Sequence, residues 1–278
     1  MSQVFEIAPS EGDFLACHAL TDMEAVFRLD TGVRLDKAGL ESWRQRWRLV
    51  LTDSKGAPRT LYLKRFDRPP FRRQWERWRE GHAGLSTAGV EWTNARLLAQ
   101  AGVPAIEAIA FGQEMVGIWE RRSFVMTREV AGESLERWVP AHLPPVGQET
   151  DFARRRRLLD GLARLVARLH RAGFVHRDLY LSHIFIEGED FRLIDLQRVF
   201  RPRWRRRRWV VKDLAALHFS TPADRVGRWE RLRFLCRYVR ACGTGESPRR
   251  LARLIHTKTQ RMARRRPELA VGVQQESS

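Results

Sequence analysis

Two neighbouring segments of the first third of the chain have the residue pattern of β-strands. They are Trp47–Thr52 and Thr60–Phe66, and the polar stretch between them contains Gly56 and Pro58. Strand-forming runs separated by a short turn of this composition predict an antiparallel hairpin. A further short strand is predicted over Ser123–Thr127.

Other segments have helical periodicity. Helices are predicted over Phe71–Gly81, over Val90–Ala101 and over Asp151–Ala172, and the chain from about Trp209 onward is also helical. The Asp151–Ala172 segment is the clearest, because Gly173 follows it as a C-terminal cap and its leucines form one apolar stripe. The stripe consists of Leu158, Leu162, Leu165, Val166 and Leu169.

The order of these elements predicts the fold class. Strands dominate the first part of the chain and helices the second, apart from two short strands about the turn Glu187–Asp190. This distribution favours an α+β fold of two lobes. We predict a β-rich N-lobe over residues 1–129 and a helical C-lobe over residues 130–278, with the boundary near residues 128–132.

Composition adds a large positive charge to this picture. The 278 residues include 51 Lys and Arg against 33 Asp and Glu, a net charge of +18, and 43% are hydrophobic. The chain is therefore expected to be globular and to meet an anionic partner. Nucleotide phosphates, nucleic acid, an acidic partner protein and an anionic membrane face all fit that description.

The three cysteines, Cys17, Cys236 and Cys242, are scattered and odd in number, so they predict neither a disulfide framework nor a metal site. The first residues lack the layout of a signal peptide, and no apolar run reaches membrane-spanning length. These features predict a protein of the reducing cytoplasm, which at a membrane would lie on the surface.

Lysine is rare in this basic chain, with only five in the whole sequence. One of them, Lys64, lies inside the second predicted hairpin strand, where a functional role is worth considering. Glu91 begins the helix that follows and is the candidate partner for its ammonium group, with Glu76 as the alternative. A strand lysine held by a helix carboxylate is the arrangement that kinases use to bind phosphates.

The sequence His176-Arg177-Asp178-Leu179 follows the apolar helix directly, and Asp195 comes seventeen residues after Asp178. The predicted short hairpin lies between them. This order resembles the kinase signature, in which one aspartate orients the attacking hydroxyl and a second binds Mg²⁺. Asp178 is therefore the candidate base and Asp195 the candidate metal ligand. Asp213 is expected to brace the loop or to cap its helix.

The segment Gly173–Val199, together with Leu61–Phe66, Glu91–Ala105 and Val210–Pro222, resembles the lipopolysaccharide kinases. That family resembles protein kinases but has His at the catalytic-loop Asn position and Asp-Leu-His in place of Asp-Phe-Gly. Here His183 takes the Asn position, where it would bind Mg²⁺ or hydrogen-bond Asp178. Asp195-Leu196-Gln197 takes the second position, with Gln197 departing from the family's His.

The resemblance implies a protein-kinase-like fold and transfer of the ATP γ-phosphate to an alcohol group. The acceptor would be a sugar hydroxyl of the lipopolysaccharide inner core, on heptose or Kdo, in an anionic glycolipid at the cytoplasmic face of the inner membrane. Lys64 and Glu91 would hold the nucleotide phosphates, and a hinge including Arg128 and Val130 would contact the nucleotide. ATP and Mg²⁺ are the expected cofactors.

Two features leave alternatives open. No G-x-G-x-x-G motif precedes Lys64, and Asp30–Gly32 and Ala38–Gly39 are weak substitutes for it. The run Arg201–Arg208, with Trp204, follows Asp195 and could flank the acceptor or form a nucleic-acid patch. The alternatives are a kinase for another small-molecule or protein hydroxyl, and a non-catalytic kinase-like or nucleic-acid-binding module, of which nucleic-acid binding is the less expected.

Overall fold

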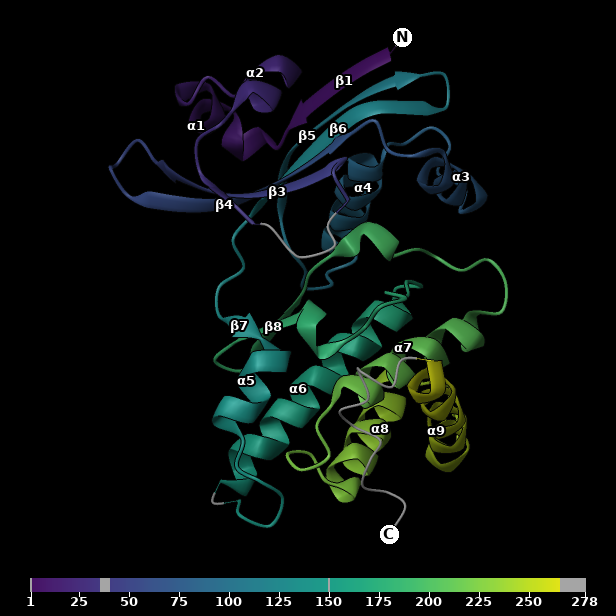
Figure 1. The fold of residues 1–278 in the computed structure, drawn as a ribbon. Helices are drawn as coiled ribbons and strands as arrows, with labels where there is room; N and C mark the ends of the chain where they lie inside the picture. Colours follow the sequence, from purple (N-terminus) through teal and green to yellow (C-terminus); the bar gives the residue numbers. More distant parts are fainter. Residues whose placement is uncertain (1, 36–40, 150, 266–278) are drawn as a thin grey trace. The chain divides into compact units, whose positions relative to one another are not determined.

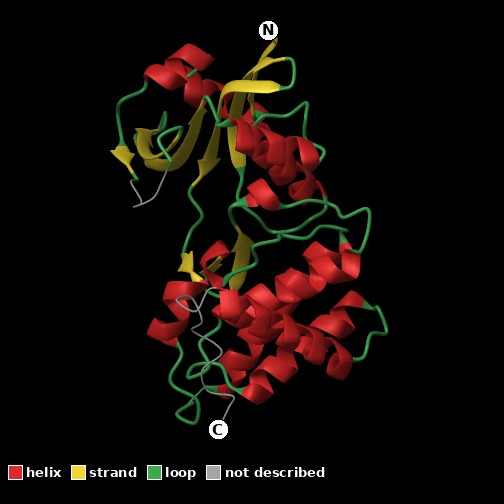
Figure 2. Ribbon diagram, turned by 45° about the vertical axis from the view of Figure 1, so that its right-hand side comes forward, coloured by secondary structure: helices red, strands yellow, loops and turns green. Residues whose placement is uncertain are grey.

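The computed structural model describes residues 2–35, 41–149 and 151–265, which divide into two compact units. The first unit comprises the described residues up to Leu97 together with Ile106–Glu129. The second comprises Leu98–Ala105 and the described residues from Val130 onward. Most strands belong to the first unit, whereas helices dominate the second (Figure 2).

An antiparallel sheet of six strands forms the centre of the first unit (Figure 1). The strand order is β1-β5-β6-β4-β3-β2. The strands are β1 (Ser2–Ile7), β2 (Val33–Arg34), β3 (Arg44–Thr52), β4 (Pro58–Asp67), β5 (Ala108–Val116) and β6 (Trp119–Arg128).

The predicted hairpin is confirmed by β3 and β4, which pair from Arg44 opposite Phe66 to Thr52 opposite Pro58. The predicted strand over Ser123–Thr127 lies within β6. Strands β1 and β5 were not predicted. They pair with each other across about a hundred residues of sequence, and their pairing is a long-range contact that no local pattern reports.

Helices cover both faces of this sheet. The helices are α1 (Gly12–Cys17), α2 (Met23–Arg28), α3 (Phe71–Arg79) and α4 (Thr87–Gln100). Side chains alternate along β4, so that Leu61 and Leu63 pack in the cluster that contains α1 and α2 residues. Phe66 packs on the opposite face against Trp92 of α4. Lys64 is two residues before Phe66 on the same strand, so its side chain projects to the same face of the sheet, the face that α4 covers.

The end of α4 and the segment after it belong to the second unit, whereas the sequence placed residues 98–105 in the N-lobe. Two contacts give the reason. The main-chain N–H of Leu193 donates to the Pro104 carbonyl at 3.1 Å, and the Arg168 guanidinium donates to the Gly102 carbonyl at 3.0 Å. The chain thus passes between the units at residues 97–98, 105–106 and 129–130.

The second unit is a helical assembly with a small sheet in the order β7-β8-β9. Its helices are α5 (Leu135–His142), α6 (Phe152–Arg171), α7 (Arg206–Ser220), α8 (Arg228–Cys242) and α9 (Pro248–Arg265). Its strands are β7 (Glu133–Ser134), β8 (Ile184–Glu187) and β9 (Asp190–Leu193). Short 3₁₀ turns lie at Pro9–Glu11, Leu181–His183 and Leu196–Arg198.

The clearest predicted helix is confirmed as α6. The Asp151 carboxylate accepts a hydrogen bond from the main-chain N–H of Arg154 at 2.8 Å, which caps the helix at its N-terminus. Gly173 follows the helix with φ of +88°, as a C-terminal glycine requires. The last helical region begins at Arg206 rather than near Trp209, because the arginine run itself forms the first turn of α7.

Of the two glycine-containing segments that precede Lys64, only Asp30–Gly32 lies within the described residues. Gly32 has φ of +111°, and a Cβ atom there would lie 2.7 Å from the Arg48 carbonyl oxygen. This glycine thus allows a close approach of two backbone segments. Ala38–Gly39 lies outside the described residues.

The cysteines form no disulfide among the residues described, and Cys17 and Cys236 are exposed. No helix within the described ranges is both long enough and apolar enough to cross a bilayer.

Gly132 provides a test of the second unit's packing. Its φ is +82°, and a Cβ atom there would lie 1.9 Å from the main-chain oxygen of Ile186. Gly132→Ala should lower the free energy of unfolding by about 1–2 kcal/mol for the left-handed backbone and about 1–3 kcal/mol more for the overlap. Urea unfolding of purified protein measures this loss.

Gly188→Ala is the matched control, since Gly188 also has positive φ, +62°, but no atom lies within 4 Å of its added Cβ. Only the backbone cost should appear in that variant. Equal losses in the two variants would contradict the close approach of residue 132 to β8.

Candidate active site

The Lys64 ammonium contacts the Glu91 carboxylate in the first unit, with 2.6 Å between Nζ and Oε1. The Glu91 side chain is fully buried and that of Lys64 is 13% exposed. Glu76, the alternative partner, instead pairs with Arg72 and Arg73 on its own helix. The structure thus contains the contact between Lys64 and Glu91, and their role toward a nucleotide stays a prediction.

A buried carboxylate anchors the start of the helix that carries Glu91. Glu120, on β6, accepts hydrogen bonds from the main-chain N–H of Thr87 at 2.8 Å and from its hydroxyl at 2.7 Å. The Ser123 hydroxyl donates to the other oxygen at 2.5 Å. Burial raises the pKa of Glu120, while these hydrogen bonds and nearby Arg77 favour the ionised form. The position of Glu91 therefore depends on contacts made one turn earlier.

The loop that carries His176-Arg177-Asp178 is held by Asp213 of α7, a fully buried residue. The two carboxylate oxygens accept the main-chain N–H groups of His176 at 2.6 Å and Arg177 at 2.7 Å. Arg177 has φ of +70°, an uncommon conformation that these bonds stabilise. The predicted bracing role of Asp213 matches this geometry, whereas no helix-cap bond to Asp213 is seen among the described contacts.

His176 supports the loop from within. Its Nε2 lies 3.0 Å from the Ile194 carbonyl oxygen, so Nε2 carries the proton and donates it. Complete burial lowers the pKa of His176, which keeps the ring neutral. The ring therefore links the catalytic loop to the residue just before Asp195.

Two cations flank the carboxylate of Asp178. Arg198 donates from Nη1 to Oδ2 at 2.7 Å, and the Lys212 ammonium lies 3.7 Å from Oδ1. Burial lowers the pKa of Lys212, and the Asp178 charge opposes that shift. Neither cation was among the predicted site residues. The rarity of lysine and the position of Lys212 immediately before Asp213 were signals that could have identified it.

His183 lies between the two candidate catalytic aspartates. Its Nδ1 is 2.7 Å from the Asp178 main-chain oxygen, so Nδ1 carries a proton and donates it to that oxygen. The other ring nitrogen, Nε2, lies 3.8 Å from Oδ2 of Asp195. That distance is too long for a hydrogen bond.

Asp195 itself has φ of +56° and precedes the 3₁₀ turn Leu196–Arg198. An imidazole nitrogen and a carboxylate oxygen separated in this way can both ligate one cation. No group of three or more His, Cys, Asp or Glu side chains in the described part of the chain could hold a metal. Mg²⁺ sites in kinases nevertheless need only one or two protein ligands, because the nucleotide phosphates supply others.

The predicted hinge residues occupy different positions. The Arg128 guanidinium pairs with Glu11 at 2.5 Å and with Glu107 at 3.4 Å, so it is engaged within the first unit. Val130 is half-buried and begins a stretch of the second unit. Nucleotide contact by either residue stays a prediction.

The arginine run is not a uniform solvated patch. Arg207 donates to Glu246 at 2.6 and 2.9 Å, and Arg206 donates to the His170 main-chain oxygen. Trp209 packs edge-on against Phe200, with 5.2 Å between ring centroids, whereas Trp204 is 83% exposed. Part of this run therefore holds α7 in place, and a role of the run beside the acceptor stays a prediction.

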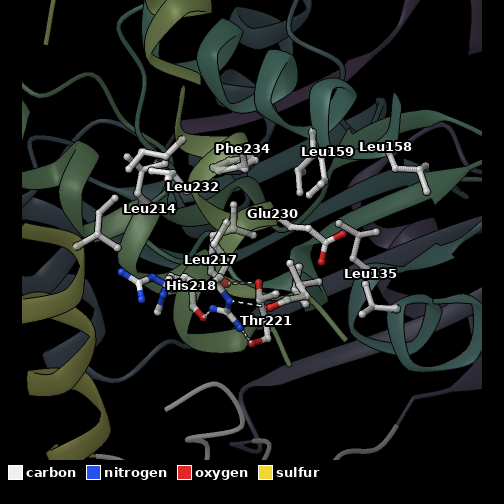
Figure 3. Close-up of a pocket in the computed structure, with 18 of the residues that line it drawn as sticks. Leu135, Leu158, Leu159, Leu214, Leu217, His218, Thr221, Glu230, Leu232 and Phe234 are labelled. Atoms are coloured by element: carbon white, nitrogen blue, oxygen red, sulfur yellow. Dashed lines mark hydrogen bonds between the residues drawn. The ribbon is translucent and has the colours of Figure 1, made fainter. Parts of the chain in front are cut away.

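A mostly apolar cavity of about 550 Å³ lies within the second unit (Figure 3). Its wall is formed by α5, α6, α7, α8 and α9 and by the small sheet, and includes Leu158, Leu217 and Phe234. Burial lowers the pKa of His218, which also lines it, to about 4, so this ring is neutral at pH 7. Arg228, Arg249 and Arg253 add positive charge to the lining. The sequence analysis did not predict this cavity.

Comparison with known proteins gives consistent relatives. The chain is 36% identical over 163 residues to the lipopolysaccharide core heptose(I) kinase WaaP of Pseudomonas aeruginosa, covering 54% of this chain and 58% of that protein. It is 33% identical over 142 residues to the protein of the same name from Escherichia coli K12, covering 47% and 52%. The chain thus spans about half the length of the curated relatives that it matches.

The structural likeness extends further. The solved structure described as WaaP in complex with acyl carrier protein is similar over 97% of this chain and 99% of that one, with a TM-score of 0.67 and 28% identity. This confirms the predicted α+β, protein-kinase-like fold. The family model described as lipopolysaccharide kinase (Kdo/WaaP) matches residues 12–238, most of the sequence. On that match, this chain belongs to the lipopolysaccharide kinase (Kdo/WaaP) family.

Proposed function

We propose that this protein is an ATP-dependent kinase that phosphorylates a sugar hydroxyl of the lipopolysaccharide inner core. The observation that carries the proposal is the loop in which Asp213 holds His176 and Arg177, the two residues before Asp178, with His183 and Asp195 adjacent. Similarity to two heptose(I) kinases favours heptose over Kdo as the acceptor. Family membership favours this function over the nucleic-acid-binding alternative.

In this proposal, Asp178 orients the acceptor hydroxyl and receives its proton. Phosphoryl transfer passes through a loose transition state, so positioning contributes more than strong basicity. The contact with Arg198 suits that role, because it fixes one oxygen of the Asp178 carboxylate. Lys64, held by Glu91, would bind the α- and β-phosphates, with Arg128 and Val130 as the proposed hinge contacts.

Asp195 and His183 are the proposed Mg²⁺ ligands. When bound, Mg²⁺ would neutralise charge on the phosphate oxygens. The hydrogen bond at Nδ1 of His183 leaves Nε2 as the ligating atom, in the manner of histidines oriented by a main-chain carbonyl.

Asp178→Asn and Asp195→Asn should each lower phosphate incorporation from Mg-ATP into extracted glycolipid by about 10²-fold or more. Asn at 178 is a far weaker base, and Asn at 195 is a weaker Mg²⁺ ligand, so ATP affinity should fall mainly in the second variant. Melting temperatures should stay close to that of the wild type. Asp190→Asn, at an exposed position in the β8–β9 hairpin, is the matched control.

Turnover at the wild-type rate in either site variant would refute its assigned role. His183 is tested in the same assay: His183→Asn should keep part of the activity that His183→Ala loses, because Asn serves at this position in protein kinases.

We also propose that Lys212 contacts the phosphoryl group in transit. Its ammonium lies beside the Asp178 oxygen at which the attacking hydroxyl would sit, and it is largely shielded from water. Positive charge at that place stabilises the transition state more than the bound nucleotide.

Lys212→Ala should therefore lower kcat at least tenfold, about 1.4 kcal/mol, with little change in the KM for ATP. Lys55→Ala, at an exposed turn of the first unit, is the control. A wild-type kcat in Lys212→Ala would reduce Lys212 to a charge partner of Asp178.

A partner protein is the second component of the proposal. The similar solved structure holds an acyl carrier protein, and this chain carries a net charge of +18. We propose that it binds an acidic carrier protein and that the apolar cavity receives the carrier's acyl chain. The cavity volume of about 550 Å³ lies in the usual range for ligand pockets.

Titration calorimetry with acyl carrier protein tests this partner. The acylated form should bind at least tenfold more tightly than the unacylated form, because only it fills the cavity. Arg249→Glu/Arg253→Glu, at exposed positions of the lining, should weaken both forms, whereas Arg156→Glu/Arg164→Glu on α6 should not. Equal affinity for the two forms would refute the role of the cavity.

The cellular location follows from the same function. A kinase that joins ATP to a membrane-borne glycolipid would work at the cytoplasmic face of the inner membrane, and we propose peripheral association with that face.

A further inference from the structure

Helix α3 buries two polar side chains and exposes two aromatic ones. The hydrophobic effect normally buries apolar side chains and leaves charged ones in water. In α3, Gln74 and Arg77 are each only 6% exposed, whereas Phe71 is 62% exposed and Trp75 is 50% exposed. A helix that buries one of its four arginines while exposing two aromatic rings presents those rings to something other than water.

Hydrogen bonds fix the helix in this orientation. The Gln74 amide donates to the main-chain oxygens of Pro69 at 3.0 Å and Glu120 at 3.3 Å, and it accepts the Glu120 N–H at 2.8 Å. Arg77 donates to the main-chain oxygens of His82 at 3.0 Å and Ile118 at 2.9 Å. Rotating the helix to bury its aromatic rings would break all of these bonds.

The turn between β5 and β6 extends the exposed apolar surface. Val116 is 51% exposed, Ile118 is 45% exposed and Trp119 is 42% exposed. The Trp119 ring centroid lies 4.6 Å from that of Trp78 and 5.8 Å from that of Phe71. The aromatic patch is defined as Phe71, Trp75, Trp78, Val116, Ile118 and Trp119. Contiguous apolar surfaces of this kind mark interaction sites.

The charge around the aromatic patch is positive. Five exposed arginines lie on α3, on β6 and in the segment just after β4. Three nearby glutamates oppose them, Glu41, Glu76 and Glu80, so the balance is still positive. The arginines are Arg68, Arg72, Arg73, Arg79 and Arg121. Trp and Phe flanked by arginine are typical of surfaces that rest in the head-group region of a bilayer, where aromatic rings enter the interface and cations meet phosphates.

We propose that the aromatic patch docks this protein on an anionic lipid leaflet. The proposal rests on the proposed function only in that the acceptor is carried by a membrane. Side chains that project from a helix and a hairpin turn suit insertion between lipid head groups. The basic border complements lipid phosphates, whose attraction for arginine decays within a Debye length.

Vesicle co-sedimentation of the full chain tests this docking surface. The wild type should bind vesicles of equal phosphatidylcholine and phosphatidylglycerol, and bind phosphatidylcholine alone at least tenfold more weakly. Phe71→Ser/Trp75→Ser and Arg72→Glu/Arg73→Glu should each lose at least tenfold in partition to the anionic vesicles. Raising the salt concentration should weaken the wild type, and it should affect the arginine double variant less.

Two controls match these changes elsewhere on the chain. Trp229→Ser removes a side chain that is 76% exposed on α8, and Arg156→Glu/Arg164→Glu reverses exposed charges on α6. Both should bind vesicles like the wild type. Quenching of tryptophan fluorescence by brominated lipid should fall in Trp75→Phe, since Trp75 is among the rings that insert.

Kinase activity separates this proposal from the proposed function. With detergent-dispersed acceptor, Phe71→Ser/Trp75→Ser should keep the wild-type kcat, and only the KM for vesicle-borne acceptor should rise. Unchanged vesicle binding in Phe71→Ser/Trp75→Ser, at an unchanged melting temperature, would overturn the docking role. So would loss of acyl carrier protein binding in place of vesicle binding, because it would assign the patch to an acidic protein.

Discussion

The buried carboxylate of Asp213 is the constraint on which the candidate catalytic centre depends. A fully buried carboxylate is costly unless its oxygens are satisfied, and two consecutive N–H groups of the catalytic loop satisfy them. The Nε2 atom of His170 lies 3.3 Å from Oδ2 of Asp213, the oxygen that also accepts the His176 N–H. In binding these groups, Asp213 sets the left-handed conformation of Arg177 and thereby the direction of Asp178. Lys212, the residue before it on α7, is placed beside Asp178 by the same helix.

In the first unit, Glu120 is likewise a buried carboxylate whose oxygens are satisfied by hydrogen bonds. This buried carboxylate holds the start of α4, and Glu91 one turn later holds Lys64. The backbone of Glu120 is also paired with Gln74 of α3, so one residue joins the phosphate-binding candidates to the helix that carries the aromatic patch. In each unit, therefore, one desolvated acid positions candidate site residues, and neither acid is itself proposed to contact a substrate.

Arginine has two roles in this basic chain, and the net charge of +18 describes only one of them. Many guanidinium groups are internal clamps that satisfy main-chain oxygens. Arg65 donates to Val26 and Leu29 at the end of α2, and Arg231 donates to Val226, His218 and Thr221. A planar group with five donors can hold several carbonyls at once, which lysine cannot. The charge available to a partner is therefore concentrated in fewer places than composition suggests.

The sequence by itself determined those features that a local pattern can encode. The β3–β4 hairpin, helices α3, α4 and α6, and the small β8–β9 hairpin follow from residue pattern, turn chemistry and caps. The order of Lys64, Glu91, Asp178, His183 and Asp195 also indicated the family, because enzymes of the protein-kinase-like fold carry the corresponding groups in this order along the chain. Strands β1 and β5 were not predicted, because they pair with each other across a long stretch of sequence.

Only the tertiary structure decided which side of each element faces inward. The pattern of α3 predicts a helix but not that its Gln74 and Arg77 are buried, because carbonyl partners of both lie about forty residues away at the start of β6. Arg198 reaches Asp178 from the turn after Asp195 and Lys212 reaches it from α7, so only the folded chain brings both cations to this carboxylate. The apolar cavity likewise arises between five helices and a small sheet. Contacts among residues remote in the chain depend on packing, and packing is a property of the folded chain as a whole.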